Sequence, residues 1–217
     1  LQVYAPKEFE EYFNLSMELF CKGLGYKVTF HPIEATETAV IYEDKSLSVE
    51  TIPLEHRIPC CGFLFREKPT APHIRRDMID HYNIPISQIS NIKAGADWTT
   101  TDGETIPNSR LTTPADKPRS YAYCSDTRYM KHLYKKVSGV DVLYHESTYT
   151  SEHNDRARTY YHSTSQEAAT VARDAAAGKL LLGHYSARYP NEDTILSEAK
   201  AIFPNSFLTN EGMVFEV

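Results

Sequence analysis

The residues of this chain that can do chemistry gather between Tyr123 and Tyr189. Four runs there, YCSDTRY, DVLYHESTY, YYHSTSQEA and KLLLGHYSARY, carry groups that can bind a metal or move a proton; these are Asp126, His145 with Glu146, His162, and His184. In α/β proteins, polar residues just past the carboxyl ends of strands are where sites form. The pattern therefore predicts one site assembled from several strand ends.

Each candidate metal ligand also has a purely structural interpretation. Asp126 can cap a helix that follows it. His56 stands alone after an alternating strand, a place where a histidine is often an ordinary surface or core residue. His184 follows Leu-Leu-Leu, and a fully buried strand seldom ends on an imidazole without a role. The three are too far apart in sequence to form a local metal motif.

Glu146 and His162 can form an acid–base pair, because a carboxylate hydrogen-bonded to an imidazole fixes its tautomer and raises its basicity. The alternative is that Glu146 forms an ion pair with Arg156 or Arg158 and that His162 only begins a helix.

Two further arginines, Arg128 and Arg188, carry planar, permanently charged groups suited to phosphate. The net charge of −6 argues against a protein that coats nucleic acid broadly, yet it leaves room for a local basic cleft.

Composition indicates a folded, soluble chain. The 217 residues are 41% hydrophobic, which is enough for one large domain or one domain with an insertion. The four cysteines form no CxxC pair and are typical of reduced thiols in a cytoplasmic protein. No apolar run approaches the roughly 20 residues of a membrane span, and no signal segment is evident, so no membrane partner is expected.

Strands and helices alternate along the second half, which favours a layered α/β architecture. Strands are predicted at residues 1–4, 26–32, 38–42, 47–54, 61–66, 141–144, 180–182, 206–208 and 213–217, and one more begins at Ser120. Helices are predicted at residues 7–24, 73–81, 128–137, 163–177 and 191–203. Residues 69–118 are rich in proline and poor in periodic apolar residues, as in an arm or lid.

Five segments in order, LEHRIPCCGFLFREK, YCSDTRY, VLYHESTY, YYHSTSQEAA and LLGHYSARY, resemble ribonuclease Z, the metallo-β-lactamase-fold endonuclease family that trims transfer-RNA 3′ ends. The resemblance covers nearly the whole chain. It implies an α/β fold, a partial αββα sandwich over residues 1–217. Residues 69–118 then form an inserted arm that grips the body of the tRNA.

The resemblance also implies a two-metal site. His56, Asp126 and His184 resemble the family's zinc ligands, with Asp126 bridging two zinc ions per intact subunit. The family's HxHxDH segment precedes the point where this sequence starts. The chain is therefore expected to be a carboxyl-terminal portion, inactive by itself.

The implied reaction is removal of the 3′ trailer from precursor tRNA by metal-hydroxide attack on a phosphodiester, in a cytoplasmic homodimer. Glu146 and His162 resemble the family's acid/base pair, and Arg188, in the closing Ser-x-Arg-Tyr, a phosphate-contacting position; Arg128 is a second candidate for RNA. Ser125 departs from the family's glycine, and the arm has Ile84-Pro85-Ile86-Ser87 in place of a Gly-Pro turn.

Two alternatives remain from the sequence. One is a non-catalytic fragment or RNA-binding remnant. The other is a hydrolase of small phosphodiesters on the same fold, which the long excursion at residues 69–118 disfavours, because a small substrate has no use for it.

Overall fold

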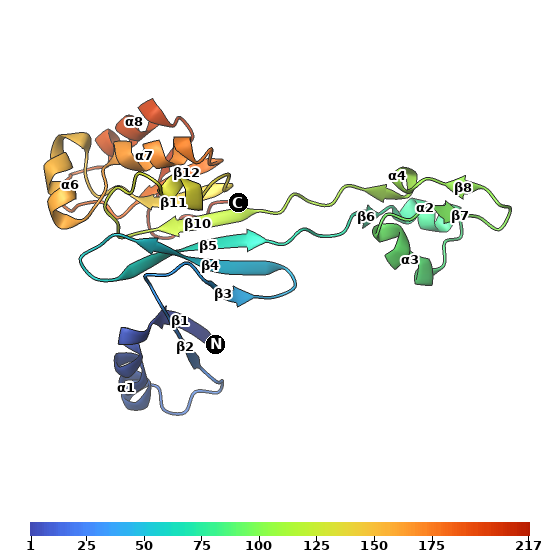
Figure 1. Cartoon of the computed structure of the whole chain (residues 1–217), viewed down its shortest axis with the longest axis horizontal. Helices are drawn as coiled ribbons and strands as arrows, with labels where there is room; N and C mark the ends of the chain where they lie inside the picture. The colour runs from blue at the N-terminus through green and yellow to red at the C-terminus, as the bar shows by residue number, and fades with distance from the viewer. The chain divides into compact units, whose positions relative to one another are not determined.

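The computed structural model describes all 217 residues, and they divide into two compact units. The first unit consists of Leu1–Arg66 together with Arg119–Val217, and the second is Glu67–Pro118. Figure 1 shows both units and labels most of their helices and strands. None of the helices is long and apolar enough to cross a membrane.

A seven-stranded sheet is the frame of the first unit. In spatial order its strands are β13 (Ser206–Leu208), β12 (Lys179–Gly183), β11 (Val142–Glu146), β10 (Ser120–Cys124), β5 (Cys60–Glu67), β4 (Leu47–Leu54) and β3 (Val40–Glu43). The four strands β10 to β13 run parallel, whereas β5 is antiparallel to β10. The parallel half therefore delivers its carboxyl ends to one edge, which is where the candidate residues follow.

Helices pack on the parallel half of the sheet (Figure 1); they are α5 (Leu133–Lys136), α6 (Asn154–Tyr160), α7 (Ser165–Asp174) and α8 (Asp193–Ile202). Helix α7 buries Ala168, Ala169 and Ala172 completely, and these small side chains let it approach β11 and β12 closely. Thr164 and Glu167 form a capping box at its start.

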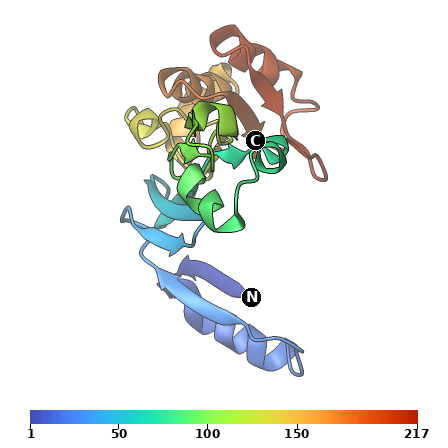
Figure 2. The ribbon, with the colours of Figure 1, turned by 90° about the vertical axis from the view of Figure 1, so that its right-hand side faces the viewer.

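The amino-terminal part of this unit is a short parallel pair with a helix. Strand β1 (Gln2–Pro6) pairs with β2 (Thr29–Ile33), and a 3₁₀ turn at Lys7–Phe9 leads into α1 (Glu10–Phe20) between them. Figure 2 shows α1 lying along this pair.

The second unit has its own small core. Its elements are β6 (His73–Ile74), α2 (Arg76–His81), α3 (Ile86–Lys93), β7 (Trp98–Thr99), β8 (Thr105–Ile106), α4 (Asn108–Leu111) and β9 (Thr112–Thr113). Ile84, Ile92, Ile106 and Leu111 are buried together. Gly103, at φ of 86°, makes the turn between β7 and β8.

Two predicted elements differ from the structure, and some helices were not predicted. The helix predicted at 128–137 shrinks to α5, because the chain from Arg128 to Met130 is irregular. No strand forms at 213–217, where the chain is mostly exposed. The sequence reading also missed α3 and α6, both short and weakly periodic.

Candidate metal and acid–base site

The parallel register of β10, β11 and β12 brings the candidate residues to one edge of the sheet. Cys124 is paired with His145, and Glu146 with Gly183, so Asp126, Glu146 and His184 leave neighbouring strands at the same level. His184 adopts a φ of 59°, in the left-handed region. Non-glycine residues seldom take this conformation, and where they do it is often at functional sites.

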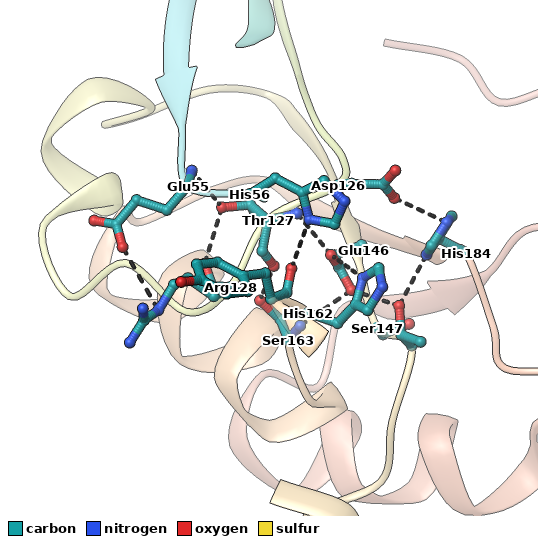
Figure 3. Close-up of polar contacts among 12 residues, drawn as sticks. Glu55, His56, Asp126, Thr127, Arg128, Glu146, Ser147, His162, Ser163 and His184 are labelled. Atoms are coloured by element: carbon teal, nitrogen blue, oxygen red, sulfur yellow. Dashed lines mark hydrogen bonds and ion pairs between the residues drawn. The ribbon is translucent and has the colours of Figure 1, made fainter. Parts of the chain in front are cut away.

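Four side chains converge there, and Figure 3 shows them facing one another. One ligand atom from each of Asp126, Glu146, His162 and His184 lies within 4.8 Å of the others. Glu146 is fully buried, the side chain of His162 is 15% exposed, and those of Asp126 and His184 are about 40% exposed. The cluster thus has a buried acid–base half and a solvent-facing half.

The solvent-facing half has the character of a cation site. Oδ1 of Asp126 lies 2.8 Å from Nε2 of His184, yet this buried oxygen has no aligned hydrogen-bond donor. When His184 is neutral, these two atoms lie side by side as two potential ligands of one cation. Carboxylate oxygen and imidazole nitrogen are also ligands that zinc accepts.

The tautomer of His184 agrees with that reading. Oγ1 of Thr148 lies 2.5 Å from Oε2 of Glu146 and 2.8 Å from Nδ1 of His184. A carboxylate only accepts, so the single hydroxyl proton goes to Glu146 and Nδ1–H of His184 donates to Thr148. This assignment follows from the hydrogen-bond network. In the neutral ring this leaves the lone pair of Nε2 on the side of Asp126, which is the state in which His184 could hold a metal.

Glu146 is the centre of the buried half. It accepts four hydrogen bonds, from Thr127 N at 2.6 Å, Thr148 Oγ1 at 2.5 Å, His162 Nδ1 at 3.0 Å and Ser163 N at 3.0 Å. Burial alone raises the pKa of this carboxyl, but the hydrogen bonds from His162, Thr148 and Ser163 outweigh it, and the pKa lies below its usual value. Glu146 is therefore held as a carboxylate.

His162 is oriented by that carboxylate. The hydrogen bond to Glu146 raises the pKa of His162, against the opposing effect of burial. Because Nδ1 is engaged with Glu146, Nε2 is the nitrogen that can exchange a proton with a substrate. The geometry suits a general acid.

His56 lies beside this cluster but outside the four converging residues. Its Nδ1 is 3.1 Å from the carbonyl oxygen of Tyr161, and its ring centroid is 5.3 Å from that of His162. It enters on the loop after β4. The structure therefore brings His56 to the site's rim.

The two predicted phosphate arginines both stack on tyrosines. Arg128 lies 5.2 Å above the ring of Tyr161 and lines a cavity of about 290 Å³ together with His162. Arg188 lies 5.2 Å above the ring of Tyr149, whose centroid is 6.2 Å from that of His162. Arg128 therefore shares a cavity with His162, whereas Arg188 is linked to His162 through the ring of Tyr149.

Sequence reasoning missed the residues that hold the site together, above all Thr148 and the amides of Thr127 and Ser163. The signal for Thr148 was present, since it follows Glu146 by two residues just past a strand end. Neither Arg156 nor Arg158 pairs with Glu146, whose partners are those given above.

No family model matches the chain. It is 48% identical over 213 residues to Ribonuclease Z of Bacteroides fragilis, covering 98% of the chain and 70% of that protein. It is 47% identical over 217 residues to Ribonuclease Z of Bacteroides thetaiotaomicron, covering 100% of the chain and 69% of that protein. The chain thus spans about 70% of the length of these curated relatives.

Solved structures give the fold. The short form of human tRNase Z aligns with 99% of the chain and 67% of its own length, at a TM-score of 0.60 and 19% identity. The metallo-β-lactamase fold protein YhfI from Bacillus subtilis aligns with 100% of the chain and 65% of its own length, at a TM-score of 0.61 and 15% identity. These likenesses confirm the predicted metallo-β-lactamase fold.

Proposed function

The chain belongs to the ribonuclease Z family, and on that premise we propose that it provides the catalytic part of a zinc-dependent endoribonuclease that removes the 3′ trailer from precursor tRNA. The observation that carries the proposal is the convergence of Asp126, Glu146, His162 and His184 within 4.8 Å. This site joins a candidate cation position to a buried acid–base pair, which is the equipment that hydrolysis of a phosphodiester needs.

Asp126 and His184 are the proposed zinc ligands, with His56 completing the set and Asp126 shared between two ions. The orphaned Oδ1 of Asp126 and the lone pair on Nε2 of His184 support this assignment. Bound zinc supplies a water of lowered pKa and offsets negative charge on the phosphate.

His162 is the proposed general acid. Its Nε2 delivers a proton to the leaving 3′-oxygen of the tRNA, and Glu146 holds the ring and stabilises its charged form. The hydrogen bonds that Glu146 accepts from Thr127 N and Ser163 N fix the carboxylate. The pair is therefore preorganised before substrate arrives.

Arg128 and Arg188 are the proposed phosphate contacts, since a guanidinium binds phosphate oxygens bidentately. The unit Glu67–Pro118, which contains the predicted arm at 69–118, is proposed to grip the body of the tRNA. Its separate core supports a module that folds apart from the catalytic unit.

We also propose the activity of the chain by itself, its oligomeric state and its location. The 217 residues alone are inactive, because His56, Asp126 and His184 give each of two zinc ions only two protein ligands, and catalytic zinc usually has three. The active form is a cytoplasmic homodimer, in which one subunit's arm serves the other's site. The four free cysteines support the cytoplasmic location, because thiols stay reduced there. Analytical ultracentrifugation tests the dimer.

A chimera provides the functional test. Its aligned region comes from this chain, and the remaining segments come from the Bacteroides fragilis relative. With zinc, the chimera is expected to cut precursor tRNA at the 3′ end of the mature sequence, and His162→Ala is expected to slow the cut roughly 100-fold or more. The 217-residue chain alone is expected to show no cleavage.

A chimera that hydrolyses a small phosphodiester such as bis(p-nitrophenyl) phosphate but leaves precursor tRNA intact would contradict the proposal and favour the small-substrate alternative. Cleavage that is unaffected by His162→Ala would contradict the role of that residue.

A further inference from the structure

Two cavities adjoin at one ion pair beside the site. Arg128 lines the cavity of about 290 Å³ that also contains His162 and Arg158. Glu55 lines a second cavity, of about 310 Å³, whose wall includes Lys131, His132 and Lys136. The Arg128 Nε lies 3.6 Å from a carboxylate oxygen of Glu55, and its backbone N–H donates to the carbonyl of Glu55 at 2.9 Å (Figure 3). The walls of the two cavities are therefore in contact at this pair.

The segment between the cavities is strongly basic. Residues 127–140 include four positively charged side chains and no acidic one. The four are Arg128, Lys131, Lys135 and Lys136, and His132 lies among them. The whole chain has a net charge of −6. Such a local concentration of positive charge in an acidic protein is typical of a surface that binds an anionic polymer.

The two lysines that line the second cavity, Lys131 and Lys136, have no acidic partner, whereas both acidic residues that line the cavities do. Lys136 Nζ is placed at the edge of the second cavity by Thr38 Oγ1, at 3.0 Å, and neither Lys131 nor Lys136 forms an ion pair. Of the two acidic residues that line the cavities, Glu55 faces Arg128, and Glu167 accepts the Thr164 N–H at 2.9 Å in its capping box.

We propose that these two cavities form a track for the RNA strand on the 5′ side of the cut, with Lys131 and Lys136 binding its phosphates. The proposal rests on the function proposed above. There, His162 protonates the leaving 3′-oxygen, and that oxygen belongs to the last nucleotide of the mature tRNA. The cavity that His162 lines therefore receives this nucleotide, and the second cavity receives the phosphates that precede it.

The first cavity is also suited to a base. Tyr129 lines it beside Arg128 and Arg158, and an aromatic ring among cationic groups binds single-stranded nucleic acid by stacking and phosphate contact. The trailer, on the other side of the cut, has no part in this track.

Fluorescence anisotropy on the 217-residue chain tests the proposal. The two probes are a fluorescein-labelled mature tRNA that ends at the cut and a labelled ten-nucleotide trailer RNA. The Lys131→Ala/Lys136→Ala double variant is expected to bind the mature tRNA about tenfold more weakly. The magnitude of its slope of log K against log salt should decrease by about 1.4, because two single-strand phosphate contacts are lost at roughly 0.7 each. Trailer binding should stay unchanged.

Two control variants separate this effect from general charge and from misfolding. Lys22→Ala/Lys200→Ala removes the same charge at exposed positions elsewhere and should bind like the wild type. Lys131→Arg/Lys136→Arg keeps the charge and should restore the salt slope. Unchanged tRNA binding in the alanine double variant overturns the track, and so does a loss confined to the trailer.

The chimera separates this proposal from the function on which it rests. If the chimera cleaves precursor tRNA, the alanine double variant should raise KM about tenfold and leave kcat unchanged. A wild-type KM overturns the track while the nuclease function stands. A chimera that never cleaves overturns the function, whereas weakened tRNA binding by the double variant would still support a basic RNA track.

Discussion

Thr148 Oγ1 lies 2.8 Å from Nδ1 of His184 and thereby determines which ring nitrogen of that histidine faces Asp126. The same hydroxyl donates to Glu146 at 2.5 Å. A chain of hydrogen bonds thus runs from the buried acid–base carboxylate to a candidate metal ligand. The two halves of the site are coupled through one side chain that itself contacts neither metal nor substrate in the proposed mechanism.

Replacing Thr148 by valine should weaken zinc binding roughly 10- to 100-fold, as the loss of an outer hydrogen-bond partner of a ligand does. Valine keeps the shape but no longer fixes Nδ1–H of His184, so the ring can turn or change tautomer. Zinc affinity by chelator competition checks this. Thr170→Val, which removes an exposed hydroxyl bonded to Gln166 O, is the matched control. Equal affinities for the two variants would refute the coupling.

Glu146→Gln should destabilise the fold by about 1–3 kcal/mol, because an amide NH₂ would face the N–H and O–H donors that the buried carboxylate now accepts. Urea unfolding of metal-free protein measures this. Glu211→Gln, at an exposed position, serves as the control and should unfold like the wild type. A variant as stable as wild type would mean that the pocket readily rearranges around an amide.

The Glu146–His162 pair should stabilise the metal-free protein most between about pH 4.5 and 6.5. The pKa of His162 is raised from 6.5, so its contribution is complete below that value and fades as pH rises through the folded pKa. The pKa of Glu146 is lowered from 4.5, so its contribution is complete above that value and fades as pH falls through the folded pKa.

Urea unfolding of wild type and His162→Gln in EDTA checks the window. The difference in unfolding free energy should be larger at pH 5.5 than at pH 8.5. A difference that stays constant or grows with pH would show that the ion pair does not supply it.

Local signals in the sequence predicted much of the frame. The strands predicted at 47–54 and 206–208 have the bounds that the structure shows, and the helix predicted at 163–177 forms as α7. These features depend on a few adjacent residues. The prediction of a helix at 128–137 was wrong in its length: the apolar spacing suits a helix, but only Leu133–Lys136 is helical in the fold.

The site depends on register, which no local pattern contains. Asp126 and His184 are 58 positions apart in the sequence and meet only because β10, β11 and β12 run parallel at one level. Residue types alone therefore suggested candidates, and the resemblance to a family supplied their roles. The hydrogen bond from His184 to Thr148 could not be predicted from the sequence, because a threonine after a strand end can have many other partners.

Gly62→Ala should destabilise the first unit by about 2 kcal/mol or more, through overpacking against backbone. A Cβ at Gly62 would lie 2.2 Å from the carbonyl oxygen of Tyr123, in the strand paired with β5, and that backbone cannot turn aside. Gly25→Ala, where a Cβ meets nothing within 4 Å, is the control. Thermal unfolding of both variants tests this, and equal midpoints would contradict it.

Excising the proposed arm should remove the grip on the tRNA body and spare the metal site. Arg66 and Ser120 are paired residues of antiparallel strands, so replacing residues 67–119 with Asn-Gly would close them as a two-residue hairpin. Zinc affinity should stay within about twofold of wild type, because Asp126, His184 and His56 all lie in the other unit.

Binding of full-length tRNA should fall at least tenfold, while a short RNA that mimics only the acceptor end should bind as before. Loss of both RNAs together would show that the segment supports the site itself, and retention of both would leave the arm without a role in tRNA binding.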